Sequence, residues 1–335
     1  MPERLCLALA LGWVLLTARL AGAAALPIVI AHRGASGYLP EHTFAAHAMA
    51  YGMGADFLES DVVLSRDSVP VVLHDRYLDD VSDAPRRFPN RTRSDGHHYV
   101  IDFTLRELRT LNLHERTVRG GSRARFPARF PSAAAEFRIH TLREMLELVH
   151  GLNRSTGRRV GVYVELKDPI WHREQGQDLT AIVLRTLREL GYDRHPRQIF
   201  IESFEPLALR RLRSEFRTRI PLVQLIGENR WSVGSEANFD AMRNAGGLAK
   251  VATYADGIGV WIGHLLRAPA GPRSLAALAH AKGLAVHAYT ARADRLPSNF
   301  ASFDALLTFL VTDQRVDGIF TDFPDKVRHF VDRQN

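Results

Sequence analysis

Short apolar runs alternate with amphipathic segments along most of this chain. Eight of the runs are four to seven residues long, as is typical of buried parallel strands. These strands are predicted at residues 28–31, 56–59, 160–165, 198–203, 220–226, 256–260, 284–289 and 318–321. Helices are predicted between them, at residues 40–53, 141–152, 177–190, 206–216, 237–245, 247–252, 274–281, 302–311 and 324–331. Eight strands alternating with helices predict an α/β fold, a (β/α)8 TIM barrel.

A doubly wound open sheet is the alternative arrangement of alternating strands and helices. Such a sheet usually carries a glycine-rich turn that binds a dinucleotide, directly after one of its strands. No Gly-x-Gly-x-x-Gly turn of this kind occurs in the sequence, so the pattern favours the barrel.

A β-hairpin is predicted just after the second barrel strand. The polar turn at residues 65–68 separates two apolar runs within residues 62–73. The hairpin would return His74 to the end of the barrel at which Glu59 and Asp61 lie. The second strand is expected to stop at Glu59, before the hairpin begins.

Residues 76–138 form a segment of different composition, rich in Arg, Asp, Pro and His. One helical piece is predicted in it, at residues 104–113. An irregular segment of this length is unusual in a compact domain unless it has a function. We interpret it as an insertion after the second barrel strand that lies over one mouth of the barrel.

The N-terminus has the layout of a secretory signal peptide. An apolar run at residues 5–16, too short to span a bilayer comfortably, is followed by small residues at 21–25. Cleavage after Ala25 would leave residues 26–335 as one catalytic domain. An uncleaved membrane anchor is the alternative. Cys6 is the only cysteine, so the processed chain would contain none.

The composition is that of a globular protein, with 46% hydrophobic and 24% charged residues and a formal net charge of +7. The arginines are scattered among acidic and aromatic residues, and no helix presents a basic face. This pattern indicates a solvated surface rather than a nucleic-acid site. We expect no nucleic-acid partner, and no stable membrane insertion once the signal peptide is removed.

Acidic side chains at strand ends are the candidate metal ligands. In a barrel of this kind the carboxyl ends of all the strands meet at one mouth. Glu59 and Asp61, two residues apart, face the same side of their strand, and Glu165 ends the next barrel strand. Mg²⁺ and Ca²⁺ prefer such oxygen ligands. The alternative is that these acids only form ion pairs with Arg33 and Lys167.

Two histidines at strand ends are the candidate general acid and base. His32 follows the first strand and His74 follows the hairpin, and histidine titrates closest to neutral pH. Arg33 and Lys167 suit a phosphate group, because both are cationic hydrogen-bond donors. Glu202 would add a further carboxylate near the metal site if its side chain turns inward.

Several other catalytic classes lack their motifs here. The sequence contains no Gly-x-Ser-x-Gly elbow, no P-loop, no Cys-x-x-Cys and no His-Glu-x-x-His. These absences argue against a serine hydrolase, a nucleotide-phosphate site and a zinc protease.

The order of these motifs resembles the glycerophosphodiester phosphodiesterase family, and most of all its bacterial periplasmic members. The motifs are His-Arg-Gly at 32–34, Glu-x-Asp at 59–61, His-Asp at 74–75, Glu-x-Lys at 165–167, Ser-Phe at 203–204 and Thr-Asp-x-Pro at 321–324. The similarity extends over residues 27–332, almost all of the processed chain. It implies a phosphodiesterase-type barrel that releases sn-glycerol 3-phosphate and an alcohol from substrates such as glycerophosphocholine and glycerophosphoethanolamine.

The resemblance also implies roles for individual residues. The family's metal ligands match Glu59, Asp61 and Glu165, its catalytic pair matches His32 and His74, and its phosphate contacts match Arg33 and Lys167. It implies Ca²⁺ as the cofactor, with Mg²⁺ as the alternative, and a periplasmic location. The periplasmic relatives tend to carry an uncharged residue at the position of Glu202.

Two other functions remain open at the level of sequence. One is a related phosphodiesterase that acts on lysophospholipid or sphingomyelin. The other is a non-catalytic surface binding protein on the same scaffold. Sequence also does not choose which histidine is the acid, or between direct hydrolysis and a route through a cyclic phosphate.

Overall fold

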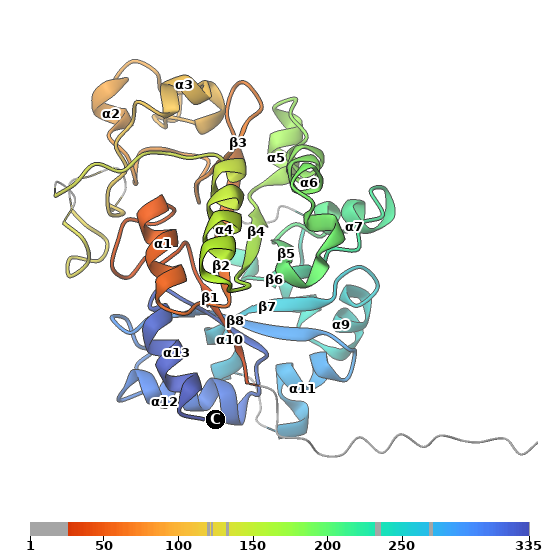
Figure 1. Ribbon diagram of the computed structural model, residues 1–335. Coiled ribbons are helices and arrows are strands. Elements are labelled where there is room, and N and C mark those ends of the chain that lie inside the picture. Colours follow the sequence, from red (N-terminus) through yellow and green to blue (C-terminus); the bar gives the residue numbers. More distant parts are fainter. Residues whose placement is uncertain are drawn as a thin grey trace, which may run out of the picture.

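The chain folds into a closed barrel of eight parallel strands surrounded by helices (Figure 1). The computed structural model describes residues 26–118, 121, 123–131, 134–231, 236–267 and 271–334. The barrel strands are β1 (Ile28–Ala31), β2 (Phe57–Leu64), β4 (Gly161–Leu166), β5 (Ile199–Ser203), β6 (Leu222–Ile226), β7 (Gly257–Trp261), β8 (Ala285–Ala291) and β9 (Gly318–Thr321). Strand β1 pairs in parallel with both β9 and β2, which closes the barrel. The predicted TIM barrel is confirmed, and the open sheet is excluded.

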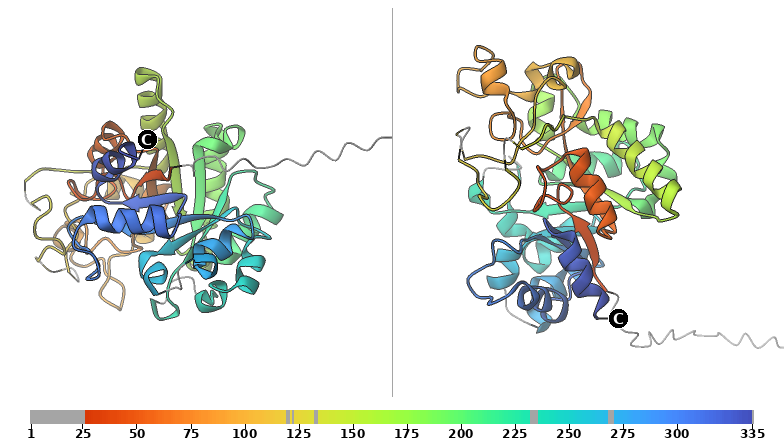
Figure 2. Two further views of the ribbon diagram at one scale, coloured as in Figure 1. Left: turned by 90° about the horizontal axis from the view of Figure 1, so that it is seen from below. Right: turned by 60° about the vertical axis from the view of Figure 1, so that its left-hand side comes forward.

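Helices follow most strands and cover the outside of the barrel (Figures 1 and 2). They are α1 (Phe44–Gly52), α4 (Leu142–Thr156), α5 (Pro169–Glu174), α6 (Leu179–Glu189), α7 (Pro206–Ser214), α8 (Phe239–Met242), α9 (Ala245–Val251), α10 (Ile262–Arg267), α11 (Leu275–His280), α12 (Phe303–Thr308) and α13 (Pro324–Asp332). Helix α4 begins at a capping box, because Thr141 accepts from the Glu144 amide and the Glu144 side chain binds back to Thr141. It ends at Gly157, which has a left-handed backbone (φ 72°).

Two apolar layers lie on the two sides of the barrel wall. Outward-facing residues such as Leu58 and Val162 pack against the buried faces of the helices. Inside the barrel, a second cluster is built from aromatic and aliphatic residues: Ile30, Phe57, Tyr163, Val223 and Phe320. Because strand side chains alternate, the next inward positions lie two residues further along the chain, within the strand or directly after it. Four of these positions are polar, namely His32, Glu59, Glu165 and Asp322.

Strand β2 is longer than predicted. It continues without a break to Leu64 and pairs antiparallel with β3 (Pro70–Val72), which confirms the hairpin. The prediction that the strand stops at Glu59 is wrong. Glu59 and Asp61 instead lie within β2, each 1% exposed. The strand continues because its extension is buried against the inserted segment as well as the barrel.

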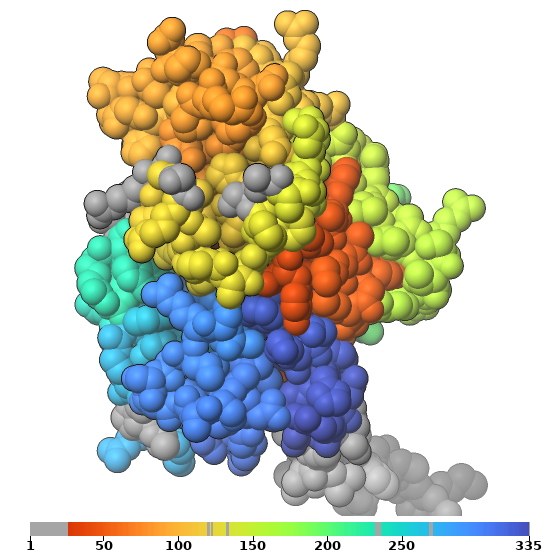
Figure 3. Space-filling model, turned by 90° about the vertical axis from the view of Figure 1, so that its left-hand side faces the viewer, coloured from red at the N-terminus to blue at the C-terminus, as the bar shows by residue number. Residues whose placement is uncertain are grey.

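The segment between β3 and α4 has a small apolar core of its own, which includes Leu78, Phe103 and Leu113. It contains α2 (Ala84–Arg87), a 3-10 turn η1 (Val100–Asp102) and α3 (Leu105–Leu108). The predicted helix at 104–113 is therefore shorter than expected. In Figure 3 the yellow part of this segment meets the blue C-terminal part of the barrel, and its orange part lies at the upper end of the view.

No helix in the described part of the chain is long and apolar enough to cross a membrane. The proposed signal peptide, residues 1–25, lies outside the described residues.

Candidate active site

One side of the candidate site lies at the carboxyl end of β1. His32 and Arg33 follow the strand directly, and Gly34 turns the chain with φ 81°. His32 Nδ1 lies 2.7 Å from Asp322 Oδ1, at the end of the neighbouring strand β9. The Arg33 amide donates to Glu59 Oε2 at 2.7 Å, which holds the start of the turn against β2.

Three buried carboxylates converge inside the barrel mouth. Glu59, Glu165 and Glu202 come from β2, β4 and β5, and one oxygen of each lies within 4.8 Å of the others. Glu59 Oε1 and Glu202 Oε2 have no hydrogen-bond partner among the described residues. Sequence reasoning left the position of Glu202 open, and the structure places it in this group.

The carboxylate group has the properties expected of a divalent-cation site. Burial, together with the charge of neighbouring acids, raises the pKa of Glu59 and of Glu202 well above the ordinary value, and burial raises that of Glu165 to about 8. Carboxylates buried together disfavour one another's charge, and a hard cation with oxygen ligands offsets that repulsion. The unpartnered oxygens of Glu59 and Glu202 are available as ligands. The donor set fits Ca²⁺ or Mg²⁺.

Asp61 lies next to this group but has other partners. Its Oδ2 accepts from His42 Nε2 at 2.7 Å and lies 3.4 Å from Arg33 Nε, and its Oδ1 lies 3.6 Å from Lys167 Nζ. Burial opposes ionisation, but Lys167 and the other cations hold the pKa of Asp61 well below its usual range. A ligand role for Asp61 stays a prediction.

The second histidine enters the site from the hairpin. His74 follows β3, and its Nδ1 lies 2.5 Å from Asp75 Oδ1. Asp75 in turn binds Arg116 of the inserted segment. Both histidines therefore have a carboxylate on Nδ1, and Nε2 of His32 accepts from Arg33 Nε at 3.2 Å. Burial and Arg33 lower the pKa of His32 to about 3 and that of His74 to about 4.

The two predicted phosphate-binding cations lie among these acids. Arg33 donates to Glu41 Oε1 at 3.0 Å, and Lys167 donates to Glu165 Oε1 at 2.8 Å. Burial opposes their charge, but Glu41 raises the pKa of Arg33 and Glu165 raises that of Lys167, so both remain cationic. The structure thus brings all the predicted site residues to one mouth of the barrel.

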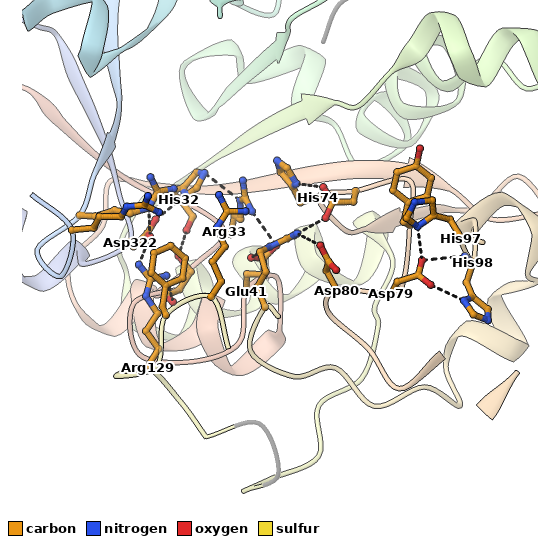
Figure 4. A pocket seen from close by; sticks show the side chains of 18 of the residues that line it. His32, Arg33, Glu41, His74, Asp79, Asp80, His97, His98, Arg129 and Asp322 are labelled. Carbon is orange, nitrogen blue, oxygen red and sulfur yellow. Dashed lines mark hydrogen bonds and ion pairs between the residues drawn. The ribbon is translucent and has the colours of Figure 1, made fainter. Parts of the chain in front are cut away.

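Two cavities meet at this mouth. A larger one of about 860 Å³ lies under the inserted segment, and a smaller one of about 440 Å³ enters the barrel beside Phe204, Trp231, Trp261 and Tyr289. Five residues belong to the lining of both cavities: His32, Arg33, His74, Arg125 and Arg292. Figure 4 shows the larger cavity, with Arg129 and Asp322 at one end, His97 and His98 at the other, and His32, Arg33 and His74 between them.

Sequence reasoning missed several residues that hold the site together. His42 was expected on the first helix, but it precedes α1 with a left-handed backbone (φ 60°) and binds Asp61. Arg116 and Arg129, from the irregular segment, bind Glu41 and Asp322. Neither arginine lies in a segment with the hydrophobic periodicity of a helix or a strand. Glu41 could have been noticed as an acid seven residues after Gly34 of the His-Arg-Gly motif.

Known proteins of similar sequence are phosphodiesterases. A model of the glycerophosphoryl diester phosphodiesterase family matches residues 32–326. The chain is 38% identical over 319 residues to a glycerophosphodiester phosphodiesterase of Haemophilus influenzae, covering 89% of this chain and 88% of that protein. It is 34% identical over 334 residues to the enzyme of the same name from Treponema pallidum, covering 92% of each.

A solved structure supports the fold. The crystal structure of a glycerophosphodiester phosphodiesterase from Agrobacterium tumefaciens aligns with a TM-score of 0.60 at 23% identity. The alignment covers 91% of this chain and all of that one.

Proposed function

The chain belongs to the glycerophosphoryl diester phosphodiesterase family, and on that basis we propose that it hydrolyses glycerophosphodiesters to sn-glycerol 3-phosphate and an alcohol. The observation that carries the proposal is the position of His32 and His74. They line both cavities, so a phosphate between them would have one half of the diester in each cavity. Glycerophosphocholine and glycerophosphoethanolamine are the proposed substrates.

The buried carboxylates would hold a divalent cation, which we propose to be Ca²⁺, with Mg²⁺ as the alternative. Glu59, Glu165 and Glu202 are the proposed ligands that the geometry supports, and Asp61 is a further candidate from sequence. When bound, the cation would act as a Lewis acid on the phosphate and offset its charge.

Arg33 and Lys167 would bind the phosphate oxygens. Both line the smaller cavity next to the carboxylate group and stay protonated at neutral pH. The arginine fork can donate two parallel hydrogen bonds to a phosphate, whereas lysine acts as a point charge. Fixed cations at this place stabilise the negative charge that grows on the phosphate in the transition state.

His32 and His74 would carry the protons. One imidazole accepts the proton of the attacking hydroxyl, and the other donates a proton to the departing alkoxide. Both are neutral in the free protein at neutral pH, since burial and Arg33 disfavour the imidazolium form. The bound phosphate is an anion close to both rings, so it favours protonation of the one that acts as the acid. The attacking hydroxyl belongs either to water or to the glycerol C2, in which case a cyclic phosphate forms first.

The charged lining of the larger cavity disfavours a lysophospholipid or sphingomyelin substrate. Such a lipid needs an apolar entrance, but this cavity is lined mainly by charged and polar side chains, among them Arg116, Arg129 and Asp79. A purely binding role is disfavoured by the intact acids and histidines. We further propose that the chain is secreted to the periplasm, on the strength of the leader pattern at residues 1–25.

The test is the release of glycerol 3-phosphate from glycerophosphocholine by the chain that starts at residue 26, with Ca²⁺, with Mg²⁺ and with EDTA. We expect turnover that EDTA abolishes and Ca²⁺ restores. His32→Ala and His74→Ala should each lose ~10²–10⁴ in kcat, as for one acid–base group. His195→Ala, an exposed histidine outside both cavities, is the matched control. Near-full turnover in either site variant would remove that histidine from the mechanism.

A further inference from the structure

The inserted segment contacts the pair formed by His74 and Asp75 through one buried arginine. Arg116 Nη1 donates to Asp75 Oδ2 at 2.5 Å, while Asp75 Oδ1 lies 2.5 Å from His74 Nδ1. The same guanidinium donates through Nε and Nη2 to the two carboxylate oxygens of Glu41, at 3.0 and 2.6 Å. Arg116 thereby joins the end of the hairpin to the loop after β1, in which Glu41 accepts from Arg33.

A second arginine of the same segment contacts the pair formed by His32 and Asp322 (Figure 4). Arg129 Nη2 donates to Asp322 Oδ2 at 2.7 Å, while Asp322 Oδ1 lies 2.7 Å from His32 Nδ1. Arg129 also donates to the two oxygens of Asp294, at 2.8 and 3.1 Å, and to the Ser36 carbonyl oxygen at 3.0 Å. Each arginine therefore forms a fork on one acid and a further contact on the acid that binds a histidine.

Neither arginine forms an ordinary surface ion pair. The side chains of Arg116 and Arg129 are 7% and 5% exposed. Burial opposes their charge, but Glu41 raises the pKa of Arg116 and Asp294 raises that of Arg129, so both stay cationic. A buried guanidinium with several charge-assisted hydrogen bonds has few alternative positions. The carboxylates that accept from it are fixed as well.

The two histidine partners depend on the inserted segment to different degrees. Apart from His74, Arg116 is the only ion-pair partner that Asp75 has among the described residues. Asp322 is also bound at 2.7 Å by Arg292, which directly follows β8. The orientation of His74 should therefore depend on the inserted segment more strongly than that of the other histidine.

We propose that Arg116 and Arg129 are positioning residues for catalysis. Each holds one histidine in place for proton transfer, through the carboxylate that the arginine and the histidine share. A catalytic histidine depends on the carboxylate at its Nδ1 for its tautomer and orientation, and proton transfer requires hydrogen-bond geometry. The active site is then complete only when the inserted segment is packed on the barrel. This inference rests on the proposed function, since it assigns both histidines to catalysis.

A double-mutant cycle tests whether Arg116 acts through Asp75. Release of glycerol 3-phosphate from glycerophosphocholine is measured with Ca²⁺ for the wild type, R116Q, D75N and R116Q/D75N. We expect R116Q to lower kcat about tenfold or more in the wild-type background, but less than about twofold in D75N, because the carboxylate that it holds is then already lost. Losses that multiply independently would overturn the inference while the proposed function stands.

The second cycle combines R129Q with D322N. It should show the same kind of coupling, with a smaller loss of kcat in R129Q than in R116Q, because Arg292 still binds Asp322. Independent losses in this cycle would remove Arg129 from the proposal.

R93Q is the matched control for both arginines. Arg93 belongs to the inserted segment, forms a fork on Asp102 at 2.7 and 2.8 Å, and donates to Gln175 at the end of α5. It contacts neither of the carboxylates that bind the histidines. R93Q should keep the wild-type kcat, and a loss equal to that of R116Q would show a merely structural role for these arginines.

A variant that does not fold is recognised in a thermal melt and replaced. R116K then takes the place of R116Q in the cycle, because lysine keeps the charge but cannot form a fork on Glu41 while it contacts Asp75. We expect R116K to lower kcat in the wild-type background and much less in D75N. A kcat equal to that of the wild type would overturn the positioning role.

Absence of turnover by the wild type would remove the proposed function, and imidazole ¹⁵N NMR would then decide the inference. The His74 signals, assigned by comparison with H74Q, should shift in R116Q because the ring loses its fixed partner. They should stay in place in R93Q. Unchanged His74 signals in R116Q would overturn the inference independently of any enzymatic assay.

Discussion

The carboxylates of Glu59 and Glu202 lie close together inside the barrel, with ligand oxygens no more than 4.8 Å apart, and each has one oxygen without a hydrogen-bond partner among the described residues. Burial raises the pKa of both acids, and the charges of Glu165 and Glu59 raise that of Glu202 further. A cation bound between the carboxylates would offset this repulsion. Glu165 completes the group from the strand between them.

A divalent cation should stabilise the fold. Binding to the native state alone adds ~2.7 kcal/mol at a cation concentration of about 100 times Kd, which should raise Tm by several degrees. We expect Ca²⁺ to raise Tm relative to EDTA in a thermal melt. Glu202→Gln should weaken calorimetric Ca²⁺ affinity by roughly tenfold or more, because a charged ligand is lost.

Glu205→Gln is the matched control for this experiment. Glu205 is also a buried acid, 3% exposed, but it accepts from the Ile170 amide at 2.7 Å and lies outside the carboxylate group. Its variant should keep the Ca²⁺ affinity. Asp61→Asn tests the remaining predicted ligand. Affinity equal to wild type in Asp61→Asn would assign Asp61 to charge balance with Lys167 and Arg33 rather than to the cation.

Asp322→Asn should impair catalysis through His32. The carboxylate accepts from His32 Nδ1 at 2.7 Å and favours the protonated ring. Loss of its charge should lower the pKa of His32 further, so the limb of the pH–rate profile that reports His32 should move to lower pH. Loss of this orienting partner should reduce kcat at least ~10-fold. Asp294→Asn, which removes another partner of Arg129 without contact to His32, should leave the profile in place. Identical pH profiles for Asp322→Asn and wild type would contradict this role.

Gly34→Ala should destabilise the turn after β1. Gly34 has φ 81°, and an added Cβ would lie 2.7 Å from the Ala46 backbone carbon in α1. The left-handed backbone costs a side chain about 1–2 kcal/mol, and overpacking adds about 1–3 kcal/mol. Gly96→Ala is the control, because Gly96 has φ 85° but open space around it. Denaturant unfolding should show a clearly larger loss at Gly34, and equal losses would exclude the steric contribution.

Acid should destabilise the protein partly through His140. This ring is 3% exposed, stacks on Phe44 with centroids 4.2 Å apart, and has no hydrogen-bond partner on either nitrogen among the described residues. Burial lowers its pKa to about 3 from an ordinary 6.5. Between these values the unfolded chain binds a proton that the folded chain does not, so stability is lost as the pH falls.

His140→Phe should remove that contribution. The free energy of unfolding should fall less steeply between about pH 6 and pH 4, by up to about 1.4 kcal/mol per pH unit. Urea unfolding at several pH values measures the slope. His195→Gln, at an exposed histidine, should keep the wild-type slope. Parallel slopes for wild type and His140→Phe would show that His140 titrates normally in the fold.

The sequence alone determined the architecture and most of the candidate site. The lengths of the apolar runs predicted the eight barrel strands, and their polar ends identified His32, His74 and Glu165. The prediction succeeds because the hydrophobic pattern of a strand can be read from neighbouring residues. Side chains two residues apart share a face, and the carboxyl ends of parallel barrel strands lie at the same mouth. The same reasoning failed at Glu59, where β2 continues past the predicted end because the inserted segment buries its extension.

Only the tertiary structure decided which side chains meet. Glu202 joins Glu59 and Glu165, whereas Asp61 pairs with His42, and both outcomes depend on the relative stagger of neighbouring strands. Arg116 and Arg129 reach the site from an irregular segment in which no repeating pattern marks them. Such contacts join residues far apart in the chain, so they are fixed by the packing of the whole barrel and not by any local pattern.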